Sequence, residues 1–123
     1  MKALLIDTER KETKVVNPQG LEDYYKLIGC DLVEIVNRKI GRKRYEIICD
    51  EEGTFRDDPK ISAIDDLGRA MLVGNLIIAG NVDDEGELTD LTANDIQYIG
   101  KRIQTMPTRK HLEGLLMLTS CNY

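Results

Sequence analysis

Residues 32–49, LVEIVNRKIGRKRYEIIC, contain two strand-like runs with a charged turn between them. The runs LVEIV (32–36) and RYEIIC (44–49) are rich in the β-branched and aromatic residues that strands favour. Gly41 supplies the positive φ angle that a tight turn needs. The stretch therefore predicts a β-hairpin with its charges near the tip. Alternation along the strand predicts Arg42 and Arg44 on one face and Lys43 on the other.

The residues before this hairpin predict a second hairpin and a short helix. Residues 2–6 and 12–16 read as paired strands, because a polar, turn-like segment separates them. Residues 21–28, LEDYYKLI, place four apolar side chains on one helical face. Gly29 is well placed to end that helix, since glycine adopts the left-handed conformation without a Cβ clash.

The second half of the chain predicts further strands and two more helices. Residues 71–80 form one strand, or two short strands hinged at Gly74-Asn75. Thr92 opens a helix, and Asp95 completes a variant of the capping box. The apolar stripe of that helix extends to Ile103. Pro107 interrupts it, and a last helix is expected to follow, with the apolar residues Leu112, Leu115, Leu116 and Met117.

This order of elements predicts an α+β fold. We expect a mostly antiparallel sheet built from hairpins, with two or three helices packed on one face. Residues 1–106 are expected to form a single α+β domain. Residues 107–123 are expected to form a C-terminal helical extension that packs on the domain or serves in dimerisation.

The composition is that of a globular protein with an aliphatic core. The 123 residues are 41% hydrophobic and 32% charged, with one Phe and no Trp. The odd count of three cysteines argues against a disulfide framework, and Cys121 in the tail is the cysteine expected to be exposed. The longest apolar run, residues 70–79, is far shorter than the roughly 20 residues of a membrane span. A cytoplasmic protein without membrane association is expected.

The charge distribution singles out the hairpin. Residues 38–44 hold five of the 17 basic residues, although the chain has a net charge of −5. The remaining 12 basic residues face 22 acidic ones, which gives −10 outside the hairpin. This background repels a polyanion, so a small anion or an acidic protein surface fits better than duplex nucleic acid. Two interpretations without a binding role stay open. The hairpin is a solvated sheet edge, or its basic side chains pair with the acids of residues 50–52.

The candidate ligand-binding residues follow from this charge. They are Arg38, Lys39, Arg42 and Arg44, with Asn75 as an addition because an amide can read a ligand hydroxyl or amide. No catalytic residues, metal ligands or cofactors are expected. His111, the only histidine, is expected on the surface of the last helix, and no nucleophile is spaced to pair with it.

Several stretches resemble a family of small proteins from phages and mobile elements of gut bacteria, the domain of unknown function 3846. The resemblance lies in MKALLI (1–6), LEDYYKLIGCDLVEIVNRKIGRKRYEIICDEEG (21–53), PKISAIDDLGRAMLVGNLIIAG (59–80) and LTDLTANDIQYI (88–99). It covers about residues 1–103 and carries over no catalytic residues. It implies a protein acting inside a bacterial host cell, often by binding.

Three functional hypotheses follow. The first is a non-enzymatic accessory protein, such as an anti-defence factor, that binds a phosphorylated small molecule such as a nucleotide signal through the basic hairpin. The second is an acidic protein-interaction module that inhibits a host nucleic-acid-binding protein or immune effector. The third, ranked last, is a metal-dependent enzyme acting on nucleotides. A homo-oligomer is compatible with all three.

Overall fold

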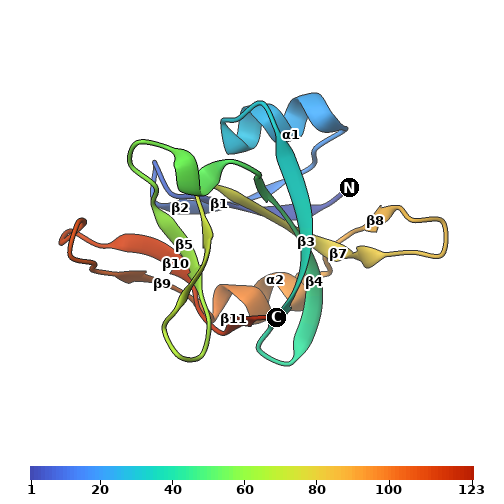
Figure 1. The fold of residues 1–123 in the computed structure, drawn as a ribbon. Helices are drawn as coiled ribbons and strands as arrows, with labels where there is room; N and C mark the ends of the chain where they lie inside the picture. Colours follow the sequence, from blue (N-terminus) through green and yellow to red (C-terminus); the bar gives the residue numbers. More distant parts are fainter.

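The computed structural model describes residues 1–123 and contains two β-sheets (Figure 1). The larger sheet has seven strands in the order β11-β3-β4-β7-β1-β2, and β8 pairs with β7. All its pairs are antiparallel. Its strands are β1 (Ala3–Asp7), β2 (Glu12–Val16), β3 (Val33–Ile40), β4 (Lys43–Asp50), β7 (Leu76–Val82), β8 (Leu88–Thr89) and β11 (Cys121–Asn122).

The smaller sheet has four strands in the order β6-β5-β10-β9. Strand β10 runs antiparallel to β9 and parallel to β5. These strands are β5 (Ile61–Ile64), β6 (Ala70–Val73), β9 (Ile103–Met106) and β10 (Leu115–Leu118). A 3₁₀ turn, η1 (Gly53–Phe55), lies between β4 and β5. The fold is therefore mostly antiparallel sheet, as predicted.

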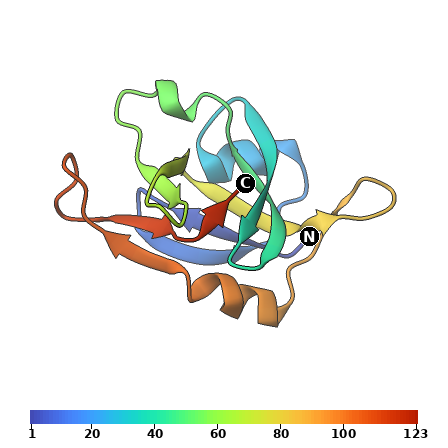
Figure 2. The ribbon, with the colours of Figure 1, turned by 60° about the horizontal axis from the view of Figure 1, so that its bottom comes forward.

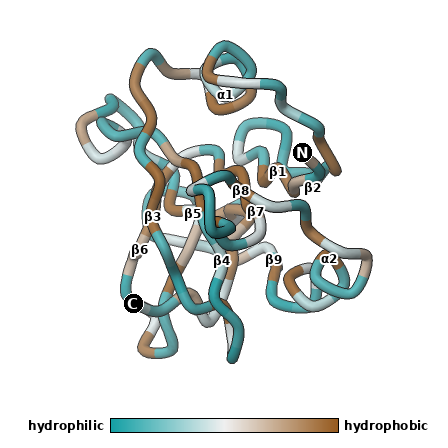
Figure 3. The backbone as a smooth tube through the Cα atoms, turned by 90° about the vertical axis from the view of Figure 1, so that its right-hand side faces the viewer, coloured by the Kyte–Doolittle hydropathy of each residue, from teal (hydrophilic) through white to brown (hydrophobic).

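The two helices pack on different sides of the larger sheet (Figures 1 and 3). Helix α1 (Leu21–Ile28) covers a cluster that contains Leu5, Ile48 and Ile77. Helix α2 (Ala93–Gly100) contributes Ile99 to the main cluster, which joins residues of both sheets. The prediction of two or three helices on one face was wrong, because β-strand alternation makes both faces of the central strands apolar.

The strands and the helix predicted for the first 50 residues are confirmed. Strands β1 and β2 form the expected hairpin. Helix α1 has the expected bounds, and Gly29 ends it in the left-handed conformation at φ 80°. Residues 71–80 form two strands rather than one. Gly74, at φ 77°, lies at the bend where the chain passes from β6 in one sheet to β7 in the other.

The segment after α2 departs from the sequence prediction. Thr92 and Asp95 form the expected capping box, but the helix ends at Gly100, and Ile103 belongs to β9. No helix follows Pro107. All four residues of β10 are buried between neighbouring strands, and β11 pairs with β3. Residues 107–123 thus contribute strands to both sheets instead of a helical extension. Neither eight-residue helix is long and apolar enough to cross a membrane.

Candidate functional site

The register of the β3–β4 hairpin divides its basic residues between two faces. Lys39 lies opposite Arg44, while Arg38 lies opposite Tyr45. Tyr45 is buried in the main cluster, so Arg38 shares the core-facing side and Lys39 and Arg44 share the other. Arg42 lies in the two-residue turn rather than on the strand, which corrects the expected alternation.

Among the four predicted hairpin cations, only Arg38 is half-buried. Its guanidinium carbon lies 4.7 Å from the centre of the Tyr123 ring. Its Nη1 donates to the backbone carbonyl of Asn37 at 3.0 Å, and its Nε is buried without a hydrogen-bond partner. This side chain therefore lies along the edge of β3.

Lys39, Arg42 and Arg44 are exposed. Arg44 Nη1 donates to Asn37 Oδ1 at 2.9 Å, and Asn37 Nδ2 donates to Glu46 Oε1 at 2.9 Å. No carboxylate lies within 4.0 Å of these three cations or of Arg38. The interpretation that the acids of residues 50–52 neutralise the hairpin fails, because Asp50 pairs with Arg56 at 2.8 Å.

Helix α2 supports the turn of the hairpin. Arg42 donates its backbone N–H to Tyr98 Oη at 2.7 Å. The Arg102 guanidinium lies 4.0 Å from the centre of the Tyr98 ring. A Cβ on Gly41 would come within 2.5 Å of Tyr98 Oη, so the close approach needs glycine at this turn. Sequence analysis missed Tyr98 and Arg102, because neither lies on the apolar stripe of the helix.

A shallow cavity of about 410 Å³ lies where β4 and β7 separate. Pairing between these strands ends at Glu46 and Ala79, after which β7 continues with β8. The cavity is lined by Lys43, Arg44, Tyr45, Gly80, Asn81, Thr89, Asp90 and Asp95. Asp95 is already engaged by Thr92 and by Tyr45 Oη at 2.8 Å. Burial raises the pKa of Asp95, but these hydrogen bonds outweigh it and the net pKa is lowered.

Asn75 does not join the hairpin residues. Its Oδ1 accepts from the backbone N–H of Thr8 at 2.8 Å and from Thr8 Oγ1 at 2.9 Å. Its Nδ2 donates to the carbonyl of Leu27 at 3.1 Å. It lines a different and larger cleft of about 470 Å³. The protein itself thus occupies both polar ends of the Asn75 side chain.

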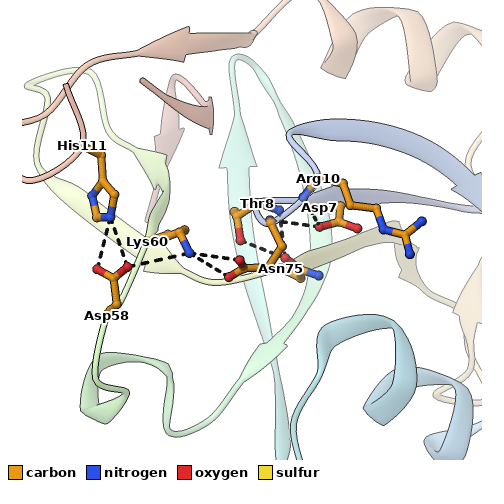
Figure 4. A network of polar contacts seen from close by, with 8 residues as sticks. Asp7, Thr8, Arg10, Asp58, Lys60, Asn75 and His111 are labelled. Carbon is orange, nitrogen blue, oxygen red and sulfur yellow. Dashed lines mark hydrogen bonds and ion pairs between the residues drawn. The ribbon is translucent and has the colours of Figure 1, made fainter. Parts of the chain in front are cut away.

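The larger cleft holds a chain of polar contacts across the two sheets (Figure 4). Lys60 Nζ lies 2.9 Å from Glu9 Oε1 and 3.8 Å from Asp58. Asp58 in turn lies 3.1 Å from His111 Nε2. His111 is buried in the β9–β10 loop. The prediction that it lies on the surface of a helix was therefore wrong. The hydrogen bond that Lys60 donates to Glu9 raises the pKa of Lys60, so this amine stays protonated and is no nucleophile at neutral pH.

All three cysteines are free thiols. Cys121 is fully buried rather than exposed, because β11 places it in the main cluster. Burial raises the pKa of Cys49 to about 12 and that of Cys121 to about 11. Both thiols are therefore protonated at neutral pH. No group of three or more His, Cys, Asp or Glu side chains lies in an arrangement that could hold a metal ion.

The fold and the site together define a two-sheet α+β protein with a basic hairpin at one end, in which Lys43 alone has a carboxylate within 4.0 Å. The chain belongs to the family described as Domain of unknown function (DUF3846), which matches residues 1–104. This confirms the resemblance drawn from the sequence. No curated protein and no solved structure matches the chain. The family match ends before β10 and β11, although both strands are built into the sheets.

Proposed function

We propose that the protein is a non-enzymatic accessory protein of phages or mobile elements that binds a small phosphorylated molecule at its basic hairpin. The observation that carries this proposal is the set of four hairpin cations without a carboxylate within 4.0 Å, in a chain with a net charge of −5. An anti-defence role, in which a nucleotide signal is sequestered, is the biological form that we favour.

The cavity beside the hairpin is the place where we expect the ligand to bind. Arg44 and Lys43 line it together with Asp90 and Asp95, and Lys43 lies 4.0 Å from Asp95. Arg44 is the lining cation without a carboxylate within 4.0 Å, and guanidinium groups bind phosphate oxygens in bidentate fashion. Asn81 Nδ2 can donate to the rest of a ligand, and Thr89 Oγ1 can accept from it while donating its own proton to the Asn81 carbonyl at 2.6 Å. The volume of about 410 Å³ falls within the range of small-molecule sites.

Thermal-shift and calorimetric titrations test the proposal. The ligands are mono-, di- and cyclic nucleotides and ADP-ribose derivatives, and the variant is Arg42→Ala/Arg44→Ala. A ligand at about 100 times its dissociation constant adds roughly 2.7 kcal/mol of stability, which shifts Tm by several degrees. We expect the double variant to lose this shift.

The control variant is Arg10→Ala/Lys14→Ala, which removes the same charge from two exposed residues at the other cleft. It should retain the shift. No shift with any ligand, or equal loss in both variants, would contradict a ligand site at the hairpin.

A second function is favoured by the β7–β8 loop. Residues 83–87 project from the body of the protein, at the end opposite the β9–β10 loop (Figure 2). Their four acids have no cation within 4.0 Å. Such an arm suits a basic surface on a host nucleic-acid-binding or immune effector protein. Charge reversal by Asp84→Lys/Glu85→Lys would then abolish inhibition, while Arg42→Ala/Arg44→Ala would leave it unchanged.

A further inference from the structure

Strand β3 has an open edge along most of its length. On one side it pairs with β4 from Val33 to Ile40. On the other side β11 pairs only with Lys39 and Ile40. The outer edge of residues 33–37 therefore has no strand beside it. Figure 1 shows this half of β3 running up from β11 at the border of the larger sheet.

The backbone of this edge is oriented for further pairing. The Leu32 carbonyl accepts from Glu51 N–H at 3.0 Å on the β4 side, and Gly41 N–H donates to Ser120 at 3.0 Å on the opposite side. Because strand residues alternate in direction, Val33, Ile35 and Asn37 point both N–H and C=O away from β4. Among these groups, the Asn37 carbonyl accepts one hydrogen bond from the Arg38 guanidinium, which leaves its second lone pair for a strand partner.

The side chains of this edge lack the usual protection. Edge strands commonly carry charges that discourage pairing, and β2, the opposite edge of the sheet, has Glu12 and Lys14. Residues 33–37 contain one charge, Glu34, and Ile35 is 50% exposed. Leu32, just before the strand, is 46% exposed. Helix α1 packs over β4 and β7, so it leaves Ile35 uncovered.

We propose that the open edge of β3 pairs antiparallel with β3 of a second copy, about a two-fold axis at Ile35. This inference goes beyond ligand binding and stands without it. Only registers that join odd-numbered residues match the outward backbone groups. In the register centred on Ile35, Val33 exchanges hydrogen bonds with Asn37 of the partner subunit. A shift towards the hairpin tip is blocked, because β11 already occupies the edge at Lys39.

Charge complementarity supports a second copy as the occupant. Glu34 and Arg38 lie on the same face of β3, and neither has an opposite charge within 4.0 Å. In the proposed register Glu34 lies opposite Val36 of the partner subunit, with the partner's Arg38 on one diagonal and the partner's Glu34 on the other. Each subunit thus gains one contact between opposite charges, against a single like-charge contact at the axis.

Pairing at this edge also places the two hairpin surfaces on one continuous sheet. Ile35, Lys39 and Arg44 share the face that points away from the main cluster. The dimer therefore carries Lys39 and Arg44 of each subunit on the same face of the joined sheet, at opposite ends of the shared edge. The two basic surfaces then face the same way, with Ile35 of each subunit between them.

Sedimentation velocity over a concentration series tests the proposal. The series should reach about 0.5 mM, because pairing along one short strand of each subunit buries little surface and gives a weak dimer. We expect a concentration-dependent dimer. Ile35→Lys places like charges opposite each other at the axis and should weaken association by at least about tenfold. The matched control is Val15→Lys, since Val15 is 48% exposed on the β2 edge. It should leave association unchanged.

A charge swap separates a dimer contact from a folding effect. Glu34→Arg and Arg38→Glu should each weaken the dimer, and the double variant should restore it. Circular dichroism checks that each variant is folded. A protein that is monomeric at every concentration would overturn the proposal. So would Ile35→Lys associating like wild type, or a double variant weaker than both single variants.

Discussion

At the scale of single residues, Asp95 joins the cap of α2 to the base of the hairpin. One carboxylate oxygen accepts from the backbone and hydroxyl of Thr92, and the other accepts from Tyr45 Oη. The same side chain lies 4.0 Å from Lys43 Nζ. Tyr45 has a raised pKa because it is buried and bonded to Asp95, so the phenol stays a donor at neutral pH. Asp95 thus holds the helix that positions Tyr98 under the turn.

We predict that Asp95→Asn lowers the free energy of unfolding by about 1–3 kcal/mol at pH 7, because the cap and a charged hydrogen bond are lost. The folded pKa of Asp95 lies below its unfolded value of about 3.9. Its contribution is therefore complete above pH 4 and is lost as the pH falls through the folded pKa. Urea unfolding at pH 7 and pH 3 should show the gap between wild type and variant shrinking at pH 3.

The control for this experiment is Asp84→Asn, in the exposed β7–β8 loop. Asp84 has no hydrogen bond or ion pair of its own, so this change should alter stability by less than about 0.5 kcal/mol. A gap for Asp95→Asn that stays constant or widens at pH 3 would show that the carboxylate charge does not stabilise the fold.

At the scale of elements, hydrogen bonds of the Asn75 side chain stabilise the bend between β6 and β7. Its amide ties the end of β1, through Thr8, to the last turn of α1, through Leu27. We predict that Asn75→Ala destabilises the protein by about 2–4 kcal/mol, because the buried Thr8 donors lose their acceptor. Asn75→Asp keeps an acceptor and should cost less. Urea unfolding measures both changes.

Ligand titration of the same variants tests the sequence-based suggestion that Asn75 reads a ligand. Affinity at the hairpin should be unchanged in folded Asn75→Asp. Reduced nucleotide affinity in this variant, under conditions where it is fully folded, would restore a binding role for Asn75.

The elements that sequence analysis predicted depend on neighbours close along the chain. The β3–β4 hairpin follows from Gly41 and its flanking strands, and the cap of α2 follows from Thr92 and Asp95 three residues apart. Strand β10 depends on distant partners instead. Its run Leu115–Leu118 suits a buried helix or a buried strand equally, and only β5 and β9 decide between them.

The candidate site was predictable in composition but not in geometry. The cluster of charge is visible in the sequence, whereas the pairing of Lys39 with Arg44 depends on the register of the hairpin. The same holds for the cavity, because Asn81 reaches it only where β7 leaves β4. His111 and Asp58 are 53 residues apart, and no local pattern joins them.

At the scale of the whole molecule, the main cluster joins residues of both sheets, so we expect the two sheets to unfold as one cooperative unit. It contains Ile47 and Ile78 of the larger sheet together with Ala63 and Leu118 of the smaller one. A cavity at Leu118 should therefore weaken both sheets equally. We predict that Leu118→Ala, at a fully buried position, lowers the free energy of unfolding by about 2–5 kcal/mol.

Native-state hydrogen exchange measures this prediction strand by strand. In Leu118→Ala, the slowest amides of β1 and β7 should lose as much protection as those of β5 and β10, because all four strands open together. Leu112→Ala makes the same change at a residue that is 79% exposed in the β9–β10 loop, and it should shift protection by less than about 0.5 kcal/mol. If Leu118→Ala reduces protection only in the smaller sheet, the sheets unfold separately. The main cluster would then not couple residues 107–123 to the rest of the protein.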